Sequence, residues 1–166
     1  PDTDIEVYEY DEGRRDEFYA RLADADALLT AFVTMDAEAM KHAPRLKVIS
    51  LNSTGFDQVD LNAATMRGIG VCPVGEYCTW DVSESAIAYM SALNKHFKLY
   101  QKEIDERHAW NYAAAPQWPR LEDQVLGIVG FGKIGKCTAE KARGLVKKII
   151  ACDPHVPHGD FVARGV

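Results

Sequence analysis

The sequence feature that most constrains the fold is a glycine-rich turn between two apolar segments. An apolar run at residues 125–129 leads into the turn, and a helix-forming segment and a second apolar run, residues 147–152, follow it. Near-continuous apolar runs are typical of parallel strands that are buried on both faces. The turn holds three glycines in the spacing G-x-G-x-x-G: Gly130, Gly132 and Gly135. The order strand, glycine turn, helix, strand predicts a dinucleotide-binding βαβ unit.

Each glycine of this unit has a distinct physical task. Gly130 allows a tight turn off the strand, Gly132 lets a pyrophosphate approach the backbone, and Gly135 lets the helix pack closely on the strand. The helix N-terminus offers free N–H groups and a partial positive charge to the phosphates. Asp153 follows the second apolar run directly, and its carboxylate can accept hydrogen bonds from the adenosine ribose. Because a carboxylate repels a 2′-phosphate, the predicted cofactor is NAD rather than NADP. The alternative is a glycine-rich turn that binds no ligand.

The earlier part of the chain alternates strand-like and helix-like segments. The predicted strands are residues 5–10, 27–32, 46–51 and 69–74, and the predicted helices are residues 12–25, 34–44 and 61–68. Thr34 and Asp36 are candidate N-caps, and Pro44 and Gly68 end helical patterns. This alternation predicts an α/β fold, with a parallel sheet and helices on its faces.

One long helix is predicted next, over about residues 82–107, with Asp81 or Ser83 as its N-cap. Its length suits a connector between two lobes and places the domain boundary near residues 76–82. A loop with two prolines, residues 111–124, leads into the βαβ unit. The helix after the glycine turn should end with a C-cap glycine near residue 146, before the second strand, but the glycine stands at position 144. The helix therefore either ends one turn sooner or is followed by a different loop.

Composition limits the classes of partner. The 166 residues carry a formal net charge of −6, which argues against nucleic acid or an anionic membrane as the main partner. No apolar run approaches the roughly 20 residues of a membrane-spanning helix, and the acidic N-terminal stretch lacks the apolar core of a signal peptide. Four cysteines without a C-x-x-C pair favour reduced, cytoplasmic thiols. We expect no metal; zinc bound by Cys72, Cys78 and a histidine is the alternative. His155 and His158 are predicted to be loop residues.

Several segments together resemble the D-isomer-specific 2-hydroxyacid dehydrogenases, which include D-lactate, D-glycerate and D-3-phosphoglycerate dehydrogenases. The resemblance runs from about Leu46 to Asp153, and its most specific parts are LKVISLNSTGFDQVDLNAATMRGIGV, VSESA, Trp110 and LEDQVLGIVGFGKIG. It implies a flavodoxin-like substrate lobe, residues 1–78, and the first βαβ part of a Rossmann NAD-binding lobe, residues 79–166, joined by the long helix. The implied reaction is hydride transfer between NAD and a small 2-keto or D-2-hydroxy acid, in a homodimer.

The resemblance also assigns site residues. Backbone N–H groups of residues 52–55 are implied to face the substrate carboxylate, and Tyr77 corresponds to a position near the substrate. The implied substrate-binding residues are Ser53, Thr54, Gly55 and Tyr77. The implied cofactor-binding residues are Gly130, Phe131, Gly132, Lys133, Ile134, Gly135 and Asp153. The family has a proline where Gly75 stands and a histidine where Ser85 stands, and these departures leave the substrate's identity open.

The reaction also needs a cation for the substrate and a proton donor. The family supplies an arginine, a carboxylate and a histidine, and we expect all three beyond Val166. No catalytic residue is therefore predicted within this chain, and His96 and His108 are predicted to be surface residues. The first strand of the substrate lobe is expected to be missing as well. A non-catalytic NAD-binding scaffold, as in the co-repressor relatives, and an inactive truncated product are the alternative interpretations.

Overall fold

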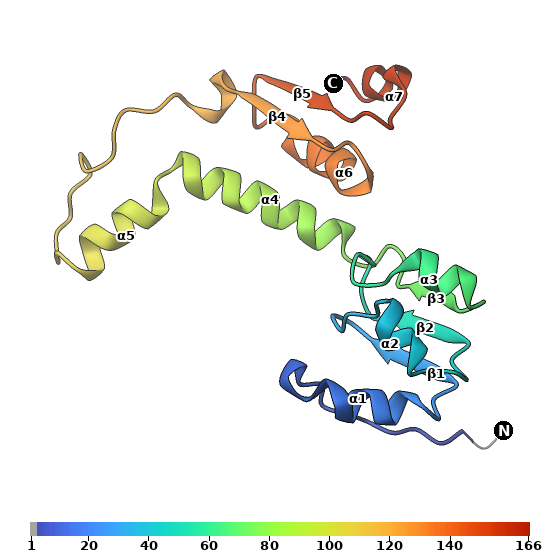
Figure 1. Cartoon of the computed structure of the whole chain (residues 1–166). Coiled ribbons are helices and arrows are strands. Elements are labelled where there is room, and N and C mark those ends of the chain that lie inside the picture. The colour runs from blue at the N-terminus through green and yellow to red at the C-terminus, as the bar shows by residue number, and fades with distance from the viewer. Residues whose placement is uncertain (1–2) are drawn as a thin grey trace. The chain divides into compact units, whose positions relative to one another are not determined.

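The computed structural model describes residues 3–166, and the chain divides into two units, Pro1–Tyr77 and Cys78–Val166 (Figure 1). Each unit contains parallel strands together with helices, so the predicted α/β class is confirmed. The assignment of the two units to a substrate lobe and a cofactor lobe stays a prediction.

The first unit is built on a parallel sheet with the strand order β1-β2-β3. Its elements are η1 (Glu12–Arg14), α1 (Arg15–Leu22), β1 (Ala27–Thr30), α2 (Ala37–Lys41), β2 (Val48–Leu51), α3 (Leu61–Met66) and β3 (Gly70–Pro73). In the central strand, Ile49 stands opposite Leu28 of β1 and Val71 of β3 and is fully buried. The hydrophobic core of this unit therefore lies along β2.

Two aspartates begin the helices that follow β1 and β2. The Asp36 carboxylate accepts the Ala39 N–H at 2.8 Å, and the Asp60 carboxylate accepts the Ala63 N–H at 2.9 Å. Both are N-cap contacts, which satisfy amides that have no partner within the helix. Of the two predicted candidates for α2, Asp36 is the N-cap and Thr34 is not.

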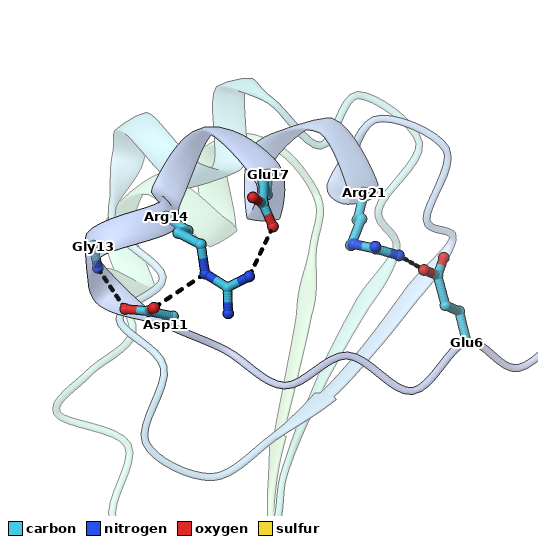
Figure 2. A network of polar contacts seen from close by, with 6 residues as sticks. All are labelled: Glu6, Asp11, Gly13, Arg14, Glu17 and Arg21. Atoms are coloured by element: carbon cyan, nitrogen blue, oxygen red, sulfur yellow. Dashed lines mark hydrogen bonds and ion pairs between the residues drawn. The ribbon is translucent and has the colours of Figure 1, made fainter.

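Residues 5–10, predicted as a strand, form none. The segment lies along α1 instead: Figure 2 shows Glu6 paired with Arg21, at the end of that helix. The Arg21 guanidinium lies 4.7 Å from the centre of the Tyr8 ring, and the Tyr10 ring meets Phe18 edge-on at 5.1 Å. A strand needs a neighbouring strand for its backbone hydrogen bonds. Here the aromatic side chains of the segment pack on a helix, and the prediction is wrong.

The start of α1 is held by a second polar cluster. Figure 2 shows the Arg14 side chain between the carboxylates of Asp11 and Glu17, at 3.0 and 3.3 Å. Asp11 also accepts the Gly13 N–H at 2.9 Å. These side chains are about half exposed, so the cluster fixes the path of the chain more than it adds to stability.

The second unit contains a two-stranded parallel sheet. Its elements are α4 (Thr79–Asn94), α5 (Phe97–Asp105), η2 (Leu121–Asp123), β4 (Val125–Val129), α6 (Lys133–Ala142), β5 (Lys148–Cys152) and α7 (His158–Ala163). Leu126 and Ile128 of β4 pack with Ile149 of β5 in the core, whereas Val129 is 90% exposed. His158 begins α7 and is not the loop residue that was predicted.

The helix predicted over residues 82–107 is two helices, α4 and α5, with a bend visible in Figure 1. The bend falls at His96, whose φ of 53° is left-handed and interrupts a right-handed helix. The ring of His96 lies edge-on to Trp118 at 5.7 Å and its Nε2 is buried, so His96, predicted to be a surface residue, is partly exposed and partly buried. His108 is exposed, as predicted, and also left-handed, with a φ of 49°.

Helices α4 and α6 pack against each other through small side chains. Ser83 is fully buried, its Oγ lies 3.1 Å from the Sγ of Cys137, and it donates to the Trp80 carbonyl at 2.8 Å. Helix α4 starts after Cys78, so Ser83 belongs to its interior and neither Ser83 nor Asp81 is the N-cap. At the rim, Lys141 pairs with Glu84 at 2.7 Å and lies over the Trp80 ring.

The glycine turn allows α6 to lie close to β4. A Cβ at Gly135 would stand 2.2 Å from the Gly130 carbonyl oxygen, a separation that no side chain tolerates. Gly130 itself has a φ of 89°, which a residue with a side chain rarely adopts. Helix α6 ends at Ala142, and Gly144 then reverses the chain with a φ of 77°, so the earlier of the two predicted ends is confirmed.

We expect Gly135→Ala to lower the free energy of unfolding by about 1–3 kcal/mol, because the backbone of the turn must move away from the new methyl group. Chemical denaturation followed by circular dichroism measures this. Gly127→Ala in β4 is the matched control, since a Cβ there meets no atom within 4 Å. Equal stability of Gly135→Ala and Gly127→Ala would contradict the close approach of α6.

Candidate functional site

The turn after β4 and the end of β5 meet through the Asp153 side chain. The Gly130 N–H donates to the Cys152 carbonyl at 2.9 Å, one residue beyond the paired strands. The next amide, that of Phe131, donates to the Asp153 carboxylate at 2.7 Å. The acid predicted to contact the ribose therefore lies at the glycine turn.

The Asp153 carboxylate is an ionised acceptor. Its second oxygen accepts the His155 N–H at 2.8 Å. The His155 and Phe131 amides hold the pKa of the Asp153 carboxyl below its usual value. The carboxylate therefore keeps its negative charge at neutral pH, and each oxygen retains a lone pair for a hydroxyl donor.

The start of α6 presents backbone N–H groups without side-chain caps. Gly132 is the N-cap residue, and space is open around the position where its Cβ would stand. Within residues 3–166, the amides of Ile134 and Gly135 donate no hydrogen bond. Unpaired amides at a helix N-terminus, beside a glycine without a side chain, fit the diphosphate of a dinucleotide.

The two side chains that follow the first glycines point to different environments. The Phe131 side chain is fully buried and stacks on Phe161 of α7, with ring centres 4.9 Å apart. Phe131 therefore reaches the turn only through its backbone. Ile134 is 39% exposed, and Lys133, the first residue of α6, is exposed as well.

In the first unit, the loops after the three strands meet at the carboxyl edge of the sheet. The Asn52 N–H donates to the Thr30 carbonyl at 2.7 Å, and the Val74 N–H donates to the carbonyls of Leu51 and Ser53, both at 3.1 Å. The Thr54 hydroxyl donates to the Gly75 carbonyl at 3.2 Å. The carboxyl edge is where parallel α/β sheets bind ligands.

The structure gathers the predicted substrate-binding residues in part. Ser53, Thr54 and Gly55 are consecutive in the loop after β2, and within residues 3–166 the amides of Ser53 and Gly55 donate no hydrogen bond. Tyr77 is 59% exposed, and its own amide donates to the Gly75 carbonyl at 3.1 Å. This contact links Tyr77 to the loop through Gly75.

One residue of this edge was assigned no role from the sequence, although it lies within the resembling segment of residues 46–71. The side-chain amide of Gln58 donates to the Ala31 carbonyl at 2.5 Å and to the Ser53 hydroxyl at 3.5 Å. Gln58 is therefore the side chain that joins the loop after β1 to the loop after β2. A lone glutamine in a polar turn does not reveal such a contact in a sequence.

Residues 3–166 contain neither a metal-binding cluster nor a membrane-spanning helix. In that range no group of three or more His, Cys, Asp or Glu side chains stands close enough to hold a metal ion, and neither Cys72 nor Cys78 is part of a disulfide. Over the same residues, no helix has both the length and the apolar character to cross a bilayer.

Comparisons with known proteins agree with this geometry. Residues 2–151 match the family described as D-isomer specific 2-hydroxyacid dehydrogenase, catalytic domain. The chain is 31% identical over 163 residues to a D-3-phosphoglycerate dehydrogenase of Mycobacterium bovis, an alignment that covers 98% of this chain and 30% of that protein.

Two solved structures resemble both the sequence and the fold. The NAD-dependent formate dehydrogenase from Staphylococcus aureus, in complex with NAD, has a TM-score of 0.76 and 29% identity over 84% of this chain and 43% of its own. The D-lactate dehydrogenase from Aquifex aeolicus, complexed with NAD and lactic acid, has a TM-score of 0.78 and 25% identity over 89% of this chain and 44% of its own.

The chain thus spans less than half the length of these relatives. The family match nevertheless extends over most of the sequence and includes both the loop after β2 and the glycine turn after β4. This protein chain belongs to the D-isomer specific 2-hydroxyacid dehydrogenase family.

Proposed function

We propose that this chain is the part of an NAD-dependent oxidoreductase that binds the cofactor and the substrate carboxylate, in an enzyme that interconverts a small 2-keto acid and a D-2-hydroxy acid. The observation that carries the proposal is the Phe131 N–H to Asp153 hydrogen bond, because it places an acid on the glycine turn. Two structural relatives with the same fold are NAD complexes.

Different residues around the turn bind different parts of NAD. The amides of Ile134 and Gly135, at the start of α6, bind the diphosphate, and Gly132 leaves room for it. Gly130 and Gly135 shape the turn, Phe131 anchors it in the core, and the exposed Lys133 would help to hold a diphosphate bound there. Asp153 accepts hydrogen bonds from the adenosine ribose. When bound, NAD supplies the acceptor or donor of the hydride.

The charge of Asp153 selects the cofactor. An ionised carboxylate accepts hydrogen bonds from a free 2′-hydroxyl but repels a 2′-phosphate at the same position. Because its pKa lies below the usual value, this discrimination persists throughout the neutral range. NAD is therefore favoured over NADP.

The loop after β2 binds the carboxylate of the substrate. The amides of Ser53 and Gly55, which have no acceptor within residues 3–166, are donors for an anion. The Thr54 hydroxyl and the Tyr77 amide both donate to the Gly75 carbonyl, so both residues belong to this edge. The named substrates of relatives are small acids: D-lactate, glyoxylate and hydroxypyruvate. A small 2-keto acid is the class that these share.

We assign neither the substrate cation nor the proton donor of the reaction to a residue of this chain. None of the four cysteines, Cys72, Cys78, Cys137 and Cys152, forms a disulfide, which suits a reducing compartment, and we place the protein in the cytoplasm.

We further propose a homodimer in which α5 and the loop after it contact a second copy. An apolar groove of about 490 Å³ lies there, lined by Phe97, Tyr100, Gln101, Glu103, Ile104, Ala109, Trp110, Asn111 and Tyr112. Trp110 is 86% exposed and Tyr112 is 82% exposed, which is unusual for large aromatic side chains of a monomer.

Asp153→Ala should weaken NADH binding about tenfold relative to NADPH binding, because the ribose loses an ionised acceptor and the 2′-phosphate loses a repelling charge. Fluorescence titration with each nucleotide gives the ratio of dissociation constants. Asp123→Ala, an acid on η2 of the same unit, is the control. Asp153→Asn keeps an acceptor oxygen for the Phe131 N–H, so it distinguishes the effect of the lost charge from the effect of a disrupted turn. An unchanged ratio in both Asp153 variants would refute the assigned role.

If the groove is the dimer contact, Trp110→Ser shifts the chain towards a monomer in analytical ultracentrifugation, since an exposed indole at the contact is lost. Phe32→Ser is the matched control, because Phe32 has the same exposed fraction, 86%, in the other unit. A Trp110→Ser protein with the mass of the unaltered chain at every concentration would argue against this interface.

A further inference from the structure

We propose that Gln58 is a positioning residue, which holds the loop after β2 in the shape that receives a substrate carboxylate. The inference rests on the proposed function, because it concerns the same anion site. Gln58 itself is not proposed to contact the substrate. It acts through Ser53.

The side-chain amide of Gln58 has two hydrogens and two acceptors. One acceptor is the Ala31 carbonyl, 2.5 Å from Nε2, and the other is the Ser53 hydroxyl oxygen at 3.5 Å. Ala31 follows β1, and Ser53 belongs to the loop after β2. The two loops at the carboxyl edge are therefore joined by one side chain.

The Ser53 hydroxyl passes this constraint on to Gly55. It accepts from Gln58 and donates its only hydrogen to the Gly55 carbonyl at 2.8 Å. A hydroxyl has a single donor hydrogen, so Ser53 has none left for a substrate. The donors that remain at this position are the amides of Ser53 and Gly55, which have no acceptor within residues 3–166.

The backbone of Gln58 is itself rigidly held. The Gln58 carbonyl accepts the Met35 N–H at 2.8 Å, and the Met35 carbonyl accepts the Asp60 N–H at 2.9 Å. Met35 is fully buried and pairs as an isolated bridge with Val59, which is 5% exposed. The Gln58 side chain thus extends from the core to the loop, which is how a support for a binding loop must be built.

A polar side chain that orders a loop before binding reduces the entropy that binding must overcome. Without the Gln58 amide, the Ser53 hydroxyl keeps its bond to the Gly55 carbonyl but loses the link to the loop after β1, so the segment that carries the Ser53 and Gly55 amides is held less firmly. Removal of Gln58 is therefore expected to weaken the binding of an anion to these amides. It should leave the cofactor turn, which belongs to the other unit, unaffected.

The test is a pair of NMR titrations of the full chain with pyruvate, followed through the amide signals of Ser53 and Gly55, for the unaltered protein and for Gln58→Met. Methionine has a similar length and no donor. We expect pyruvate to shift both signals, and Gln58→Met to raise the dissociation constant about three- to tenfold. The heteronuclear NOE of the same amides should fall in the variant before pyruvate is added.

Gln124→Met is the matched control, because the Gln124 amide donates to the Pro119 carbonyl at 2.7 Å in the second unit. It should leave the pyruvate titration unchanged. NADH affinity should be the same in all three proteins, a result that a general loss of folding would not give.

Equal pyruvate affinity in the unaltered protein and Gln58→Met overturns the inference and leaves the proposed function standing. An unaltered protein whose Ser53 and Gly55 signals ignore pyruvate overturns the proposed function, and the inference with it. If Gln58→Met does not fold, Ser53→Ala removes the same relay and leaves the Gln58 to Ala31 bond in place. Unchanged pyruvate affinity in Ser53→Ala then also overturns the inference.

Discussion

Both parallel sheets of this chain end in the same way, and the candidate sites depend on it. A backbone hydrogen bond carries the ladder one step past the strands, from Gly130 to Cys152 at 2.9 Å in one unit and from Asn52 to Thr30 at 2.7 Å in the other. A side chain then takes over the next contact. The Asp153 carboxylate accepts the Phe131 amide, and the Gln58 amide bridges the following residues of the first sheet. Beyond these points the backbone amides have no strand to pair with, and they become available to a ligand.

This arrangement explains how a chain with a formal net charge of −6 can bind anionic ligands. Backbone amides and the start of α6 provide the positive potential locally, so no surplus of lysine or arginine is needed. An acidic side chain near such amides then selects between ligands and does not repel every anion. In the proposed function Asp153 accepts a ribose hydroxyl and repels an additional phosphate. The loop after β2 places the neutral side chains of Ser53 and Thr54 beside its amides, and one carboxylate, that of Asp57, lies 3.9 Å from where a Cβ of Gly55 would stand.

The parts of the fold that sequence predicts well are those decided by neighbours along the chain. The order of β4, the glycine turn, α6 and β5 follows from glycines and apolar runs within one segment, and the end of α6 follows from Gly144. The N-cap at Asp36 is equally local. Three other predictions failed because their outcome depends on distant partners. Residues 5–10 alternate like a strand but pack on Phe18 of α1, the long helix bends where His96 packs against Trp118, and Ser83 lies buried against Cys137 instead of capping α4.

The same distinction separates the two candidate sites. The cofactor turn is built from residues 130–135 and one acid, and every member has a spacing that a sequence displays. The candidate substrate site at the carboxyl edge of the first sheet is built from three loops that meet only when the strands pair. The role of Gln58 there is recognisable only from its hydrogen bond to the Ala31 carbonyl in another loop. Sequence comparison therefore identifies the cofactor readily and the substrate poorly, as the range of named substrates among the relatives shows. In a parallel α/β fold, differences in substrate choice should be sought among the residues that shape the loops at the carboxyl edge. These residues include polar side chains that form hydrogen bonds to other loops, and not only the side chains that face the ligand.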